Sequence, residues 1–476
     1  MSWEAVIGLE VHVQLKTAEK LFCPDSTVFG ADPNSNVCPV CLGLPGALPV
    51  LNQQAVELAV RTALALECRV HRTSVFARKN YFYPDLPKGY QISQFERPLA
   101  TGGLFSAPHP EGGRVEVRIR RIHMEEDAGK SVHDRLPHAT AVDLNRTGTP
   151  LVEIVTEPDL RSPEGARAFL QGLKHHLEYL EVSDCNMEEG SLRVDANVSL
   201  RRSGTEALGT KTELKNLNTF SGVEKALVLE IERQRAELDD GRAVEHQTLL
   251  WDGARGEIRP MRTKEESHDY RYFPDPDLPP LIVEESEVEA IRGQLPEFPQ
   301  ARRLRFQEEF GLPEYDAGVL TATRGLADYF ERAAAAVGDG KLASNWVMGP
   351  VLQELNQRGL DPKEFPLDPV VLAELVELVQ SEVISHRVGR KVLVSVLETG
   401  KSPAAIVEEE GLAQVKDEDA LEEWVSQVLD SHPDEVQRLQ EGEDRLLGFF
   451  VGQVMRVSEG KADPKEVSRR LRDAVS

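Results

Sequence analysis

Apolar and other residues alternate strictly along two segments of the chain. Apolar side chains occupy every second position from Leu192 to Leu200, and again from Ile7 to Leu15. Since a strand places successive side chains on opposite faces, each segment predicts a strand with one apolar face. The intervening positions are Ser191, Arg193, Asp195, Asn197 and Ser199 in the first segment, and Gly8, Glu10, His12 and Gln14 in the second.

These intervening positions have an unusual chemical composition. An antiparallel sheet with one face in water produces the same alternation, so the pattern alone does not indicate a site. An ordinary solvated face is rich in Thr, Lys and Glu, whereas these segments combine carboxylate, imidazole, amide and guanidinium groups. Such groups can hold a metal ion and a phosphate, and this composition favours a functional face.

The hydrophobic pattern changes near residue 295. Before it, short alternating runs such as 114–119 and 151–157 are separated by Gly and Pro, and helical spacing occurs around 52–66 and 163–180. After it, strand patterns nearly vanish and segments such as 370–380 have apolar residues at helical spacing. The first part is therefore expected to be rich in sheet and the second part helical.

This change predicts an α+β protein with three domains. We expect an antiparallel-sheet domain at 1–294, an all-α domain at 295–405 and a small all-α tail domain at 406–476. A chain of 476 residues is long enough for two to four domains, so this division fits its length.

Composition narrows the class of protein. The formal net charge of −25 argues against indiscriminate nucleic-acid binding, because phosphates are repelled on average. Basic residues gather near the C-terminus, where a nucleic acid would be met locally; they are Arg456, Lys461, Lys465, Arg469, Arg470 and Arg472. No apolar run is long enough for a membrane span, and the first residues lead directly into a strand rather than a signal peptide. We expect a cytoplasmic protein.

A second group of acidic residues follows the alternating run that starts at Val115. Glu125, Glu126 and Asp127 come before any lysine that could neutralise them. Mg²⁺ bound to a nucleotide takes one or two carboxylates plus phosphate oxygens, so Glu10, Glu125 and Asp195 would suffice. The alternative interpretation is a solvated acidic turn after an edge strand. Residues 211–218 mix cations, amides and an acid, which suits a polyanion held by metal.

Two common nucleotide-binding motifs are absent from the sequence. The segment Ala128–Ser131 imitates the end of a phosphate-binding loop, but Met124 stands where that motif requires glycine. The segment 41–46 fails the glycine spacing of a dinucleotide-binding fold. Any ATP must therefore bind to another architecture.

The five cysteines indicate metal or redox chemistry rather than a disulfide framework. Cys38 and Cys41 form a closely spaced pair, and with Cys23 they supply three of the four ligands of a zinc site. Asp25 stands where a fourth thiolate would be expected. The alternative is a proline-braced turn with buried thiols. Cys68 and Cys185 are isolated and are interpreted as packing residues.

Nine motifs together resemble the B subunits of the bacterial aspartyl/glutamyl-tRNA amidotransferases. They are GLEVHVQL (8–15), CPVCLGLPGALP (38–49), KNYFYPDLPKGYQISQ (79–94), MEEDAGKS (124–131), DLNRTGTPLVEIVTE (143–157), MEEGSLRVDANVS (187–199), KTELKNLNTF (211–220), DYRYFPDPDLP (269–279) and LGFFVGQVMRVSEGKADP (447–464). The resemblance covers essentially the whole chain, and Asp25 is its one clear departure, since the family often has cysteine there. The chain has no room for the inserted synthetase-like domain of the archaeal relatives, the E subunits.

The resemblance implies a fold, a reaction and a set of site residues. The first domain would be similar to glutamine synthetase, an antiparallel cradle for ATP and Mg²⁺. The family phosphorylates the side-chain carboxylate of Glu on tRNA(Gln) or Asp on tRNA(Asn), and ammonia then displaces phosphate. By motif match, Glu10, His12 and Glu125 would hold Mg²⁺, with Asp195 as a further catalytic residue. Contacts to the nucleotide or acyl phosphate would come from Arg193, Lys211 and Lys215.

The resemblance also implies partners. The chain shows no amidase signature, and the family obtains ammonia from an amidase, its A subunit, with a small C subunit completing a heterotrimer. The residues that would line the path of ammonia are Lys79, Lys88, Glu125, Asp127 and Thr149. The helical domains, including a YqeY-like tail, would hold the tRNA through the basic cluster at Arg456–Arg472, for which a solvated helix face is the alternative.

Two other functions stay open from the sequence. The chain could be a tRNA-binding scaffold without chemistry, or a freestanding ligase that joins ammonia to a small carboxylate substrate. The acidic positions argue against the scaffold, and the helical tail argues against the small-substrate ligase.

Overall fold

The computed structural model describes residues 2–136, 138–261, 270–413, 418–441, 443, 445–458 and 461–475. Of the motifs quoted above, Asp269, Glu459 and Gly460 lie outside the described residues. The chain divides into two compact units, Met1–Phe298 and Pro299–Ser476, each described by itself below. The predicted division into three domains stays a prediction, although the second unit has two separate hydrophobic cores.

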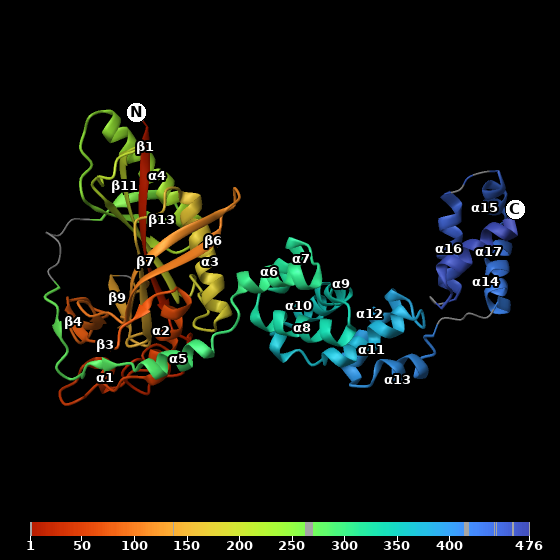
Figure 1. The fold of residues 1–476 in the computed structure, drawn as a ribbon, viewed down its shortest axis with the longest axis horizontal. Helices are drawn as coiled ribbons and strands as arrows, with labels where there is room; N and C mark the ends of the chain where they lie inside the picture. The colour runs from red at the N-terminus through yellow and green to blue at the C-terminus, as the bar shows by residue number, and fades with distance from the viewer. Residues whose placement is uncertain are drawn as a thin grey trace. The chain divides into compact units, whose positions relative to one another are not determined.

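The first unit is built on one large sheet. Its described part has nine strands in the order β14-β13-β12-β11-β1-β10-β7-β6-β2, and β1 runs through the middle (Figure 1). The strands are β1 (Trp3–Gln14), β2 (Arg69–Val70), β6 (Ala100–Pro108), β7 (Arg114–Glu126), β10 (Pro150–Thr156), β11 (Leu192–Arg202), β12 (Thr212–Leu217), β13 (Thr248–Asp252) and β14 (Glu257–Pro260). Seven neighbouring pairs are antiparallel as predicted, and the pair of β12 and β13 is parallel, so the sheet is predominantly antiparallel with one parallel pair.

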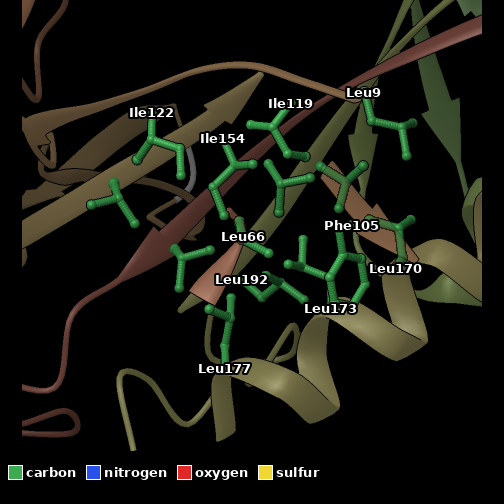
Figure 2. Close-up of a cluster of buried hydrophobic side chains, with 14 of the residues drawn as sticks. Leu9, Leu66, Phe105, Ile119, Ile122, Ile154, Leu170, Leu173, Leu177 and Leu192 are labelled. Atoms are coloured by element: carbon green, nitrogen blue, oxygen red, sulfur yellow. The ribbon is translucent and has the colours of Figure 1, made fainter. Parts of the chain in front are cut away.

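The apolar face of the sheet is covered by helices. These helices are α2 (Gln53–Ala65), α3 (Pro163–Tyr179) and α4 (Phe220–Asp239). The first two confirm the helices predicted at 52–66 and 163–180. Side-chain caps fix the starts of α3 and α4, since Ser162 Oγ accepts a hydrogen bond from Gly165 N at 3.0 Å and Thr219 Oγ1 accepts one from Gly222 N at 3.0 Å. Figure 2 shows Leu170, Leu173 and Leu177 of α3 among the buried residues of the sheet.

Smaller elements complete the first unit. β5 (Tyr90–Gln94) lies against β7 and pairs with β4 (Phe76–Asn80), which also pairs with β15 (Phe273–Pro274). Two further strand pairs join β8 (Lys130–Leu136) to β9 (Ala139–Asp143), and β3 (Thr73–Ser74) to β16 (Leu281–Ile282). The short helices are α1 (Pro39–Leu42) and α5 (Glu285–Gly293). Because β5 contacts β7, part of β7 is shielded from water.

The second unit is helical throughout its described residues, as expected. Its first core contains α6 (Pro299–Phe310), α7 (Glu314–Leu320), α8 (Arg324–Val337), α9 (Gly340–Trp346), a π-helical turn (Val347–Val351), α10 (Leu352–Arg358), a 3₁₀ turn (Pro362–Glu364), α11 (Pro369–Gln380), α12 (His386–Thr399) and α13 (Pro403–Glu409). The second core joins α14 (Glu418–Ser431), α15 (Pro433–Gln440), α16 (Arg445–Val457) and α17 (Pro464–Val475). None of the described helices has the length and apolar character of a membrane span.

Leu173 provides a test of the packing between α3 and the sheet, because its side chain is almost completely buried there. Leu173→Ala is expected to lower the free energy of local opening by about 2–5 kcal/mol, since it leaves a cavity. Amide hydrogen exchange in α3 and β6 would measure the change. Leu208→Ala, at a position that is 62% exposed, is the control and should have little effect. Equal protection in both variants would contradict the packing described here.

Candidate functional site

The register of the central strands brings the polar positions into rows. β1 pairs His12 with Glu153 of β10 on one side and with Arg193 of β11 on the other. The same register pairs Glu10 with Asp195, and β10 pairs Glu153 with His123 of β7. Side chains opposite each other on antiparallel strands share a face. The predicted polar face therefore exists, and it extends across β7, β10, β1, β11 and β12; we call it the polar face below.

The centre of the polar face is a group formed by His12, Glu125 and Glu153. His12 Nε2 lies 3.3 Å from Glu125 Oε1 and 3.3 Å from Glu153 Oε2. His123 Nε2 lies 3.3 Å from the same Glu153 oxygen, and its Nδ1 is buried with no hydrogen-bond partner among the described residues. Ser93 Oγ of β5 donates to Glu125 Oε2 at 3.2 Å. Two buried carboxylates therefore share two imidazoles.

Electrostatics within this group favour ionised carboxylates. Burial alone would lower the pKa of His12, but its hydrogen bonds with Glu125 and Glu153 raise it to about 10. Burial would raise the pKa of both carboxyls, yet His12 holds the pKa of Glu125 below its usual value. His123 and His12 together hold the pKa of Glu153 well below its usual value. The protein thus keeps two carboxylates charged out of water by placing the protonated imidazole of His12 within 3.3 Å of both.

The same group fits a divalent cation. One ligand atom each from His12, Glu125 and Glu153 lies within 4.8 Å of the other two, which is the convergence that a metal requires. Of the three residues that the sequence favoured for Mg²⁺, the structure groups His12 and Glu125. It places Glu10 on the neighbouring Asn197, whose Nδ2 donates to Glu10 Oε1 at 3.1 Å. Burial and nearby Glu153, Glu213 and Asp195 raise the pKa of Glu10, a crowding of carboxyls that a cation would relieve.

The interpretation of residues 125–127 as a solvated acidic turn is wrong. Glu125, Glu126 and Asp127 are each only 2% exposed, and β7 lies between β10 and β6 rather than at an edge. Glu126 pairs with Lys88, and its Oε1 also accepts from Ile92 N at 2.9 Å. The carboxylates are buried because each meets a specific donor.

The residues expected to contact phosphate lie along β11 and β12, but most of them are paired. Arg193 Nη2 lies 2.8 Å from Asp127 Oδ1. Lys215 Nζ lies 2.8 Å from Asp195 Oδ2 and 2.9 Å from Glu213 Oε1. Lys211 is exposed and donates to the amide oxygen of Asn197 at 3.0 Å. Lys211 is thus the most available of the three cations.

The residues expected to line a path for ammonia surround the buried acidic segment. Burial, the largest single influence, would lower the pKa of Lys79, but Glu125 and Glu153 together with two nearby tyrosines outweigh it and raise the pKa. Asp127 accepts from Gln14 Nε2 at 2.9 Å, and its backbone N–H donates to Thr149 O at 2.8 Å. Lys88 pairs with Glu126 as described above. The structure therefore brings Lys79, Lys88, Asp127 and Thr149 to one end of the polar face.

Several residues near the site were missed by the sequence analysis. Glu153 sits in an ordinary apolar strand pattern, and only its pairing with His12 reveals it. Phe95 and Tyr272 stack with ring centroids 4.1 Å apart and an interplanar angle of 2°. Tyr270 contacts both Tyr272 and Tyr81 edge to face. These aromatic residues come from three chain segments, so no local sequence signal joins them.

A second group of potential ligands lies around Cys41. Its sulfur is 3.6 Å from Cys23 Sγ and 3.9 Å from Cys38 Sγ, and it donates to Asp25 Oδ2 at 3.1 Å. One ligand atom each from the four residues lies within 4.8 Å of the others. Hydrogen bonding with Cys23, helped by the ammonium of Lys20, lowers the pKa of Cys41 to about 6. Cys68 and Cys185 are buried elsewhere, as expected for packing residues.

The basic residues of the tail differ in availability. Arg469 pairs with Glu466, and Arg470 lies near Glu422 and Glu466. Within the described residues, no ion pair involves Arg456, Lys461 or Lys465. The solvated-face alternative therefore applies better to Arg469, whose side chain is 60% exposed, than to these three cations, while Arg470 is largely buried.

Models of known protein families match residues in both units. The family model "GatB/GatE catalytic domain" matches residues 5–289, and the model "GatB domain" matches residues 328–475. In Moorella thermoacetica, the B subunit of aspartyl/glutamyl-tRNA(Asn/Gln) amidotransferase is 53% identical over 477 residues, with 100% of both chains covered. The corresponding B subunits of Chlorobium chlorochromatii and Caldanaerobacter subterraneus are 53% and 52% identical, and the matches cover 98% and 100% of this chain and of their own lengths.

The matched regions include the polar face, the cysteine group and the tail helices, so the similarity is not confined to the fold of one unit. With a family model over more than half of its length and full-length relatives at this identity, the chain belongs to the GatB family, the B subunits of aspartyl/glutamyl-tRNA amidotransferases.

Proposed function

We propose that the chain is the activating subunit of a glutamine-hydrolysing ligase that amidates aminoacyl-tRNA. Its substrate would be Glu-tRNA(Gln), Asp-tRNA(Asn) or both, and its product the corresponding Gln-tRNA(Gln) or Asn-tRNA(Asn). The observation that carries the proposal is the buried group of His12, Glu125 and Glu153, in a chain whose full-length relatives are named for this substrate class.

The reaction needs an activating step because a carboxylate resists attack by ammonia. A carboxylate oxygen first forms a bond to the γ-phosphorus of ATP, and the bond from that phosphorus to the bridging oxygen breaks, releasing ADP. The nitrogen of ammonia then attacks the carbonyl carbon, the bond to the phosphate oxygen breaks, and phosphate leaves. The nitrogen loses one proton to give the amide.

Residues of the polar face would bind the metal ion and the phosphates of this reaction. His12, Glu125 and Glu153 would bind Mg²⁺, with Glu10 beside them, and the ion when bound would offset charge between ATP and the incoming carboxylate. Lys211 is available to meet a phosphate oxygen, whereas Arg193 and Lys215 would first have to exchange their carboxylate partners. The ion pairs of Asp127 and Asp195 keep these cations positioned at the edge of the group.

Ammonia would come from partner subunits. The sequence contains no amidase signature, so we propose a heterotrimer with an amidase, the A subunit, and a small C subunit. Lys79, Lys88, Asp127 and Thr149 would line the last part of the path of ammonia, because they surround Glu125 and Glu126. Neither alternative accounts for the whole chain: a scaffold needs no buried acidic group, and a ligase for small substrates needs no tail.

Variants of the central group test this function. In the assembled enzyme, Glu125→Gln, Glu153→Gln and His12→Ala are each expected to reduce tRNA-dependent ATP cleavage by orders of magnitude, since each removes a ligand of the charge-offsetting ion. The matched control is Glu116→Gln, an exposed carboxylate on the same strand β7. Near wild-type cleavage in the folded variants would refute the assignment of this group.

The cysteine group is proposed to hold Zn²⁺ with three thiolates and the carboxylate of Asp25. Zinc with four such anions carries an excess negative charge that is costly to bury. Lys20 offsets it, because this lysine is 0% exposed and its ammonium donates to Cys41 Sγ at 3.3 Å and to Asn36 O at 2.7 Å. The buried ammonium beside the sulfur therefore supports a site that holds thiolates.

Metal content and spectra test the cysteine group without measuring activity. Lys20→Met is expected to weaken zinc binding roughly 10- to 100-fold against a competing chelator, as loss of supporting contacts does. Asp25→Cys should strengthen the sulfur-to-metal charge-transfer band of the Co²⁺-loaded chain. Asp32→Asn, at a position on the same loop, is the control. Unchanged zinc retention and an unchanged spectrum would exclude this site.

The tail is proposed to contact tRNA through Arg456, Lys461 and Lys465. Arg456→Gln, Lys461→Gln and Lys465→Gln should each lower the slope of log affinity against log salt by roughly 0.7–0.9, the contribution of one phosphate contact. Lys401→Gln is the control, since Lys401 pairs with Glu409. A triple variant with unchanged affinity and slope would show that tRNA is held elsewhere.

A further inference from the structure

Arg121 is an unusual cation on the polar face. It lies on β7, and its register partners are Val155 on β10 and Thr101 on β6. Residues two apart on a strand share a face, so its side chain is on the same face as His123 and Glu125. Its Nε is buried and has no hydrogen-bond partner, and no carboxylate pairs with its guanidinium among the described residues. Buried donors without partners are rare in folded proteins.

The environment of Arg121 is aromatic. The guanidinium carbon is 5.9 Å from the centroid of the Phe95 ring, which is stacked on Tyr272. Phe95 directly follows β5 and is 42% exposed, so part of a flat apolar surface faces water beside the guanidinium. Tyr270 contacts Tyr272 and Tyr81 edge to face, and the ammonium of Lys79 lies 4.9 Å from the Tyr270 centroid.

The position of Arg121 relates it to the central group. His123, Glu153 and His12 are cross-strand partners, and Arg121 lies two residues before His123 on the same strand. The cross-strand partner of Arg121 is Val155, and the next partner across the sheet is Glu10. With strands about 4.8 Å apart, its Cα is roughly 10 Å from that of Glu10. A nucleotide is long enough to reach across that separation.

We infer that Arg121 and the stacked rings of Phe95 and Tyr272 form a binding site for an adenosine nucleotide. The guanidinium would meet a phosphate, and the base would lie on the exposed ring surface. This inference rests on the proposed function, which supplies two ligands of this chemistry. One is ATP, and the other is the 3′-terminal adenosine of the tRNA, whose ribose carries the amino acid.

Arg121 is assigned to this ligand because its charge is otherwise unexplained. The neighbouring cations of the polar face, Arg193, Lys215 and Lys88, each touch a carboxylate. A bound phosphate would provide the same partner for Arg121 and a charge-assisted hydrogen bond for its buried Nε. Base stacking on aromatic side chains is a general mode of holding single nucleotides, and it requires an exposed ring face.

Two binding measurements on the assembled enzyme test the inference and identify the ligand. The first uses ADP with Mg²⁺ in the absence of tRNA. The second compares tRNA that ends in its terminal adenosine with tRNA that lacks it. Arg121→Met is expected to weaken binding of the ligand at this site at least about tenfold, the contribution of a hydrogen bond to a charged group. Phe95→Leu should weaken it by about 5- to 150-fold, the range for one stacked base.

The controls separate a local effect from loss of structure. Arg118→Met removes a cation of the same strand that is paired with Asp159, and Phe29→Leu removes a ring that is 68% exposed; both should bind as wild type. Arg121→Lys keeps the charge and should restore part of the affinity.

The two binding arms give distinct outcomes. If the Arg121→Met and Phe95→Leu variants bind only ADP more weakly, the ligand is ATP. If they lose only the preference for tRNA that ends in its terminal adenosine, the ligand is the end of the tRNA. If the folded Arg121→Met and Phe95→Leu variants retain wild-type affinity in both arms, the inference is overturned. Wild-type enzyme that shows no tRNA-dependent ATP cleavage would instead contradict the proposed function.

Discussion

Buried charge on the polar face requires close partners, and the rest of the first unit depends on meeting that requirement. Glu125, Asp127 and Glu153 are almost completely out of water, where an uncompensated charge would cost several kcal/mol. Their partners come from distant parts of the chain, His12 from β1 and Arg193 from β11. The partners meet only in one register of β1 with its neighbours. A slip by one residue would turn every polar side chain into the apolar core.

The register is therefore set from both faces of the sheet. On the apolar face, Ile7, Leu9 and Val11 are buried against the helices, and on the opposite face His12 is fixed by its carboxylates. Burial of the apolar face excludes a slip by one residue, and the contacts of His12 exclude a slip by two. Together the two requirements explain how a strand can carry ionisable groups among its alternate positions and still occupy the centre of the sheet. The same rule of paired burial accounts for Lys20, whose ammonium is enclosed beside the cysteine sulfurs.

Sequence reasoning succeeded where the pattern has a fixed period. Alternation predicted β1 and β11 with their polar sides, and helical spacing predicted α2, α3 and α11. Sequence reasoning failed where a residue's environment depends on its partners on neighbouring strands. Glu153 lies within a run of five buried residues, so its role emerges only from its cross-strand partner His12. The acidic segment allowed the interpretation of a surface turn because sequence does not show that β5 shields β7. The parallel pair of β12 and β13 depends on the long connection through α4, which a local pattern does not encode.

The distribution of cations on the polar face separates structure from ligand binding. Cations that touch carboxylates, such as Arg193, Lys215 and Lys88, balance charges that the fold itself has buried. Any ligand that took one of them would leave a carboxylate without its partner, so these groups are costly to recruit. Lys211 and Arg121 balance no buried carboxylate, since Lys211 donates to the amide oxygen of Asn197 and Arg121 lies beside the ring of Phe95. They sit on opposite sides of the central group, Lys211 on the side of β12 and Arg121 on β7. An anionic ligand laid across the group would meet a cation at each end without disturbing the ion pairs that hold the sheet in register.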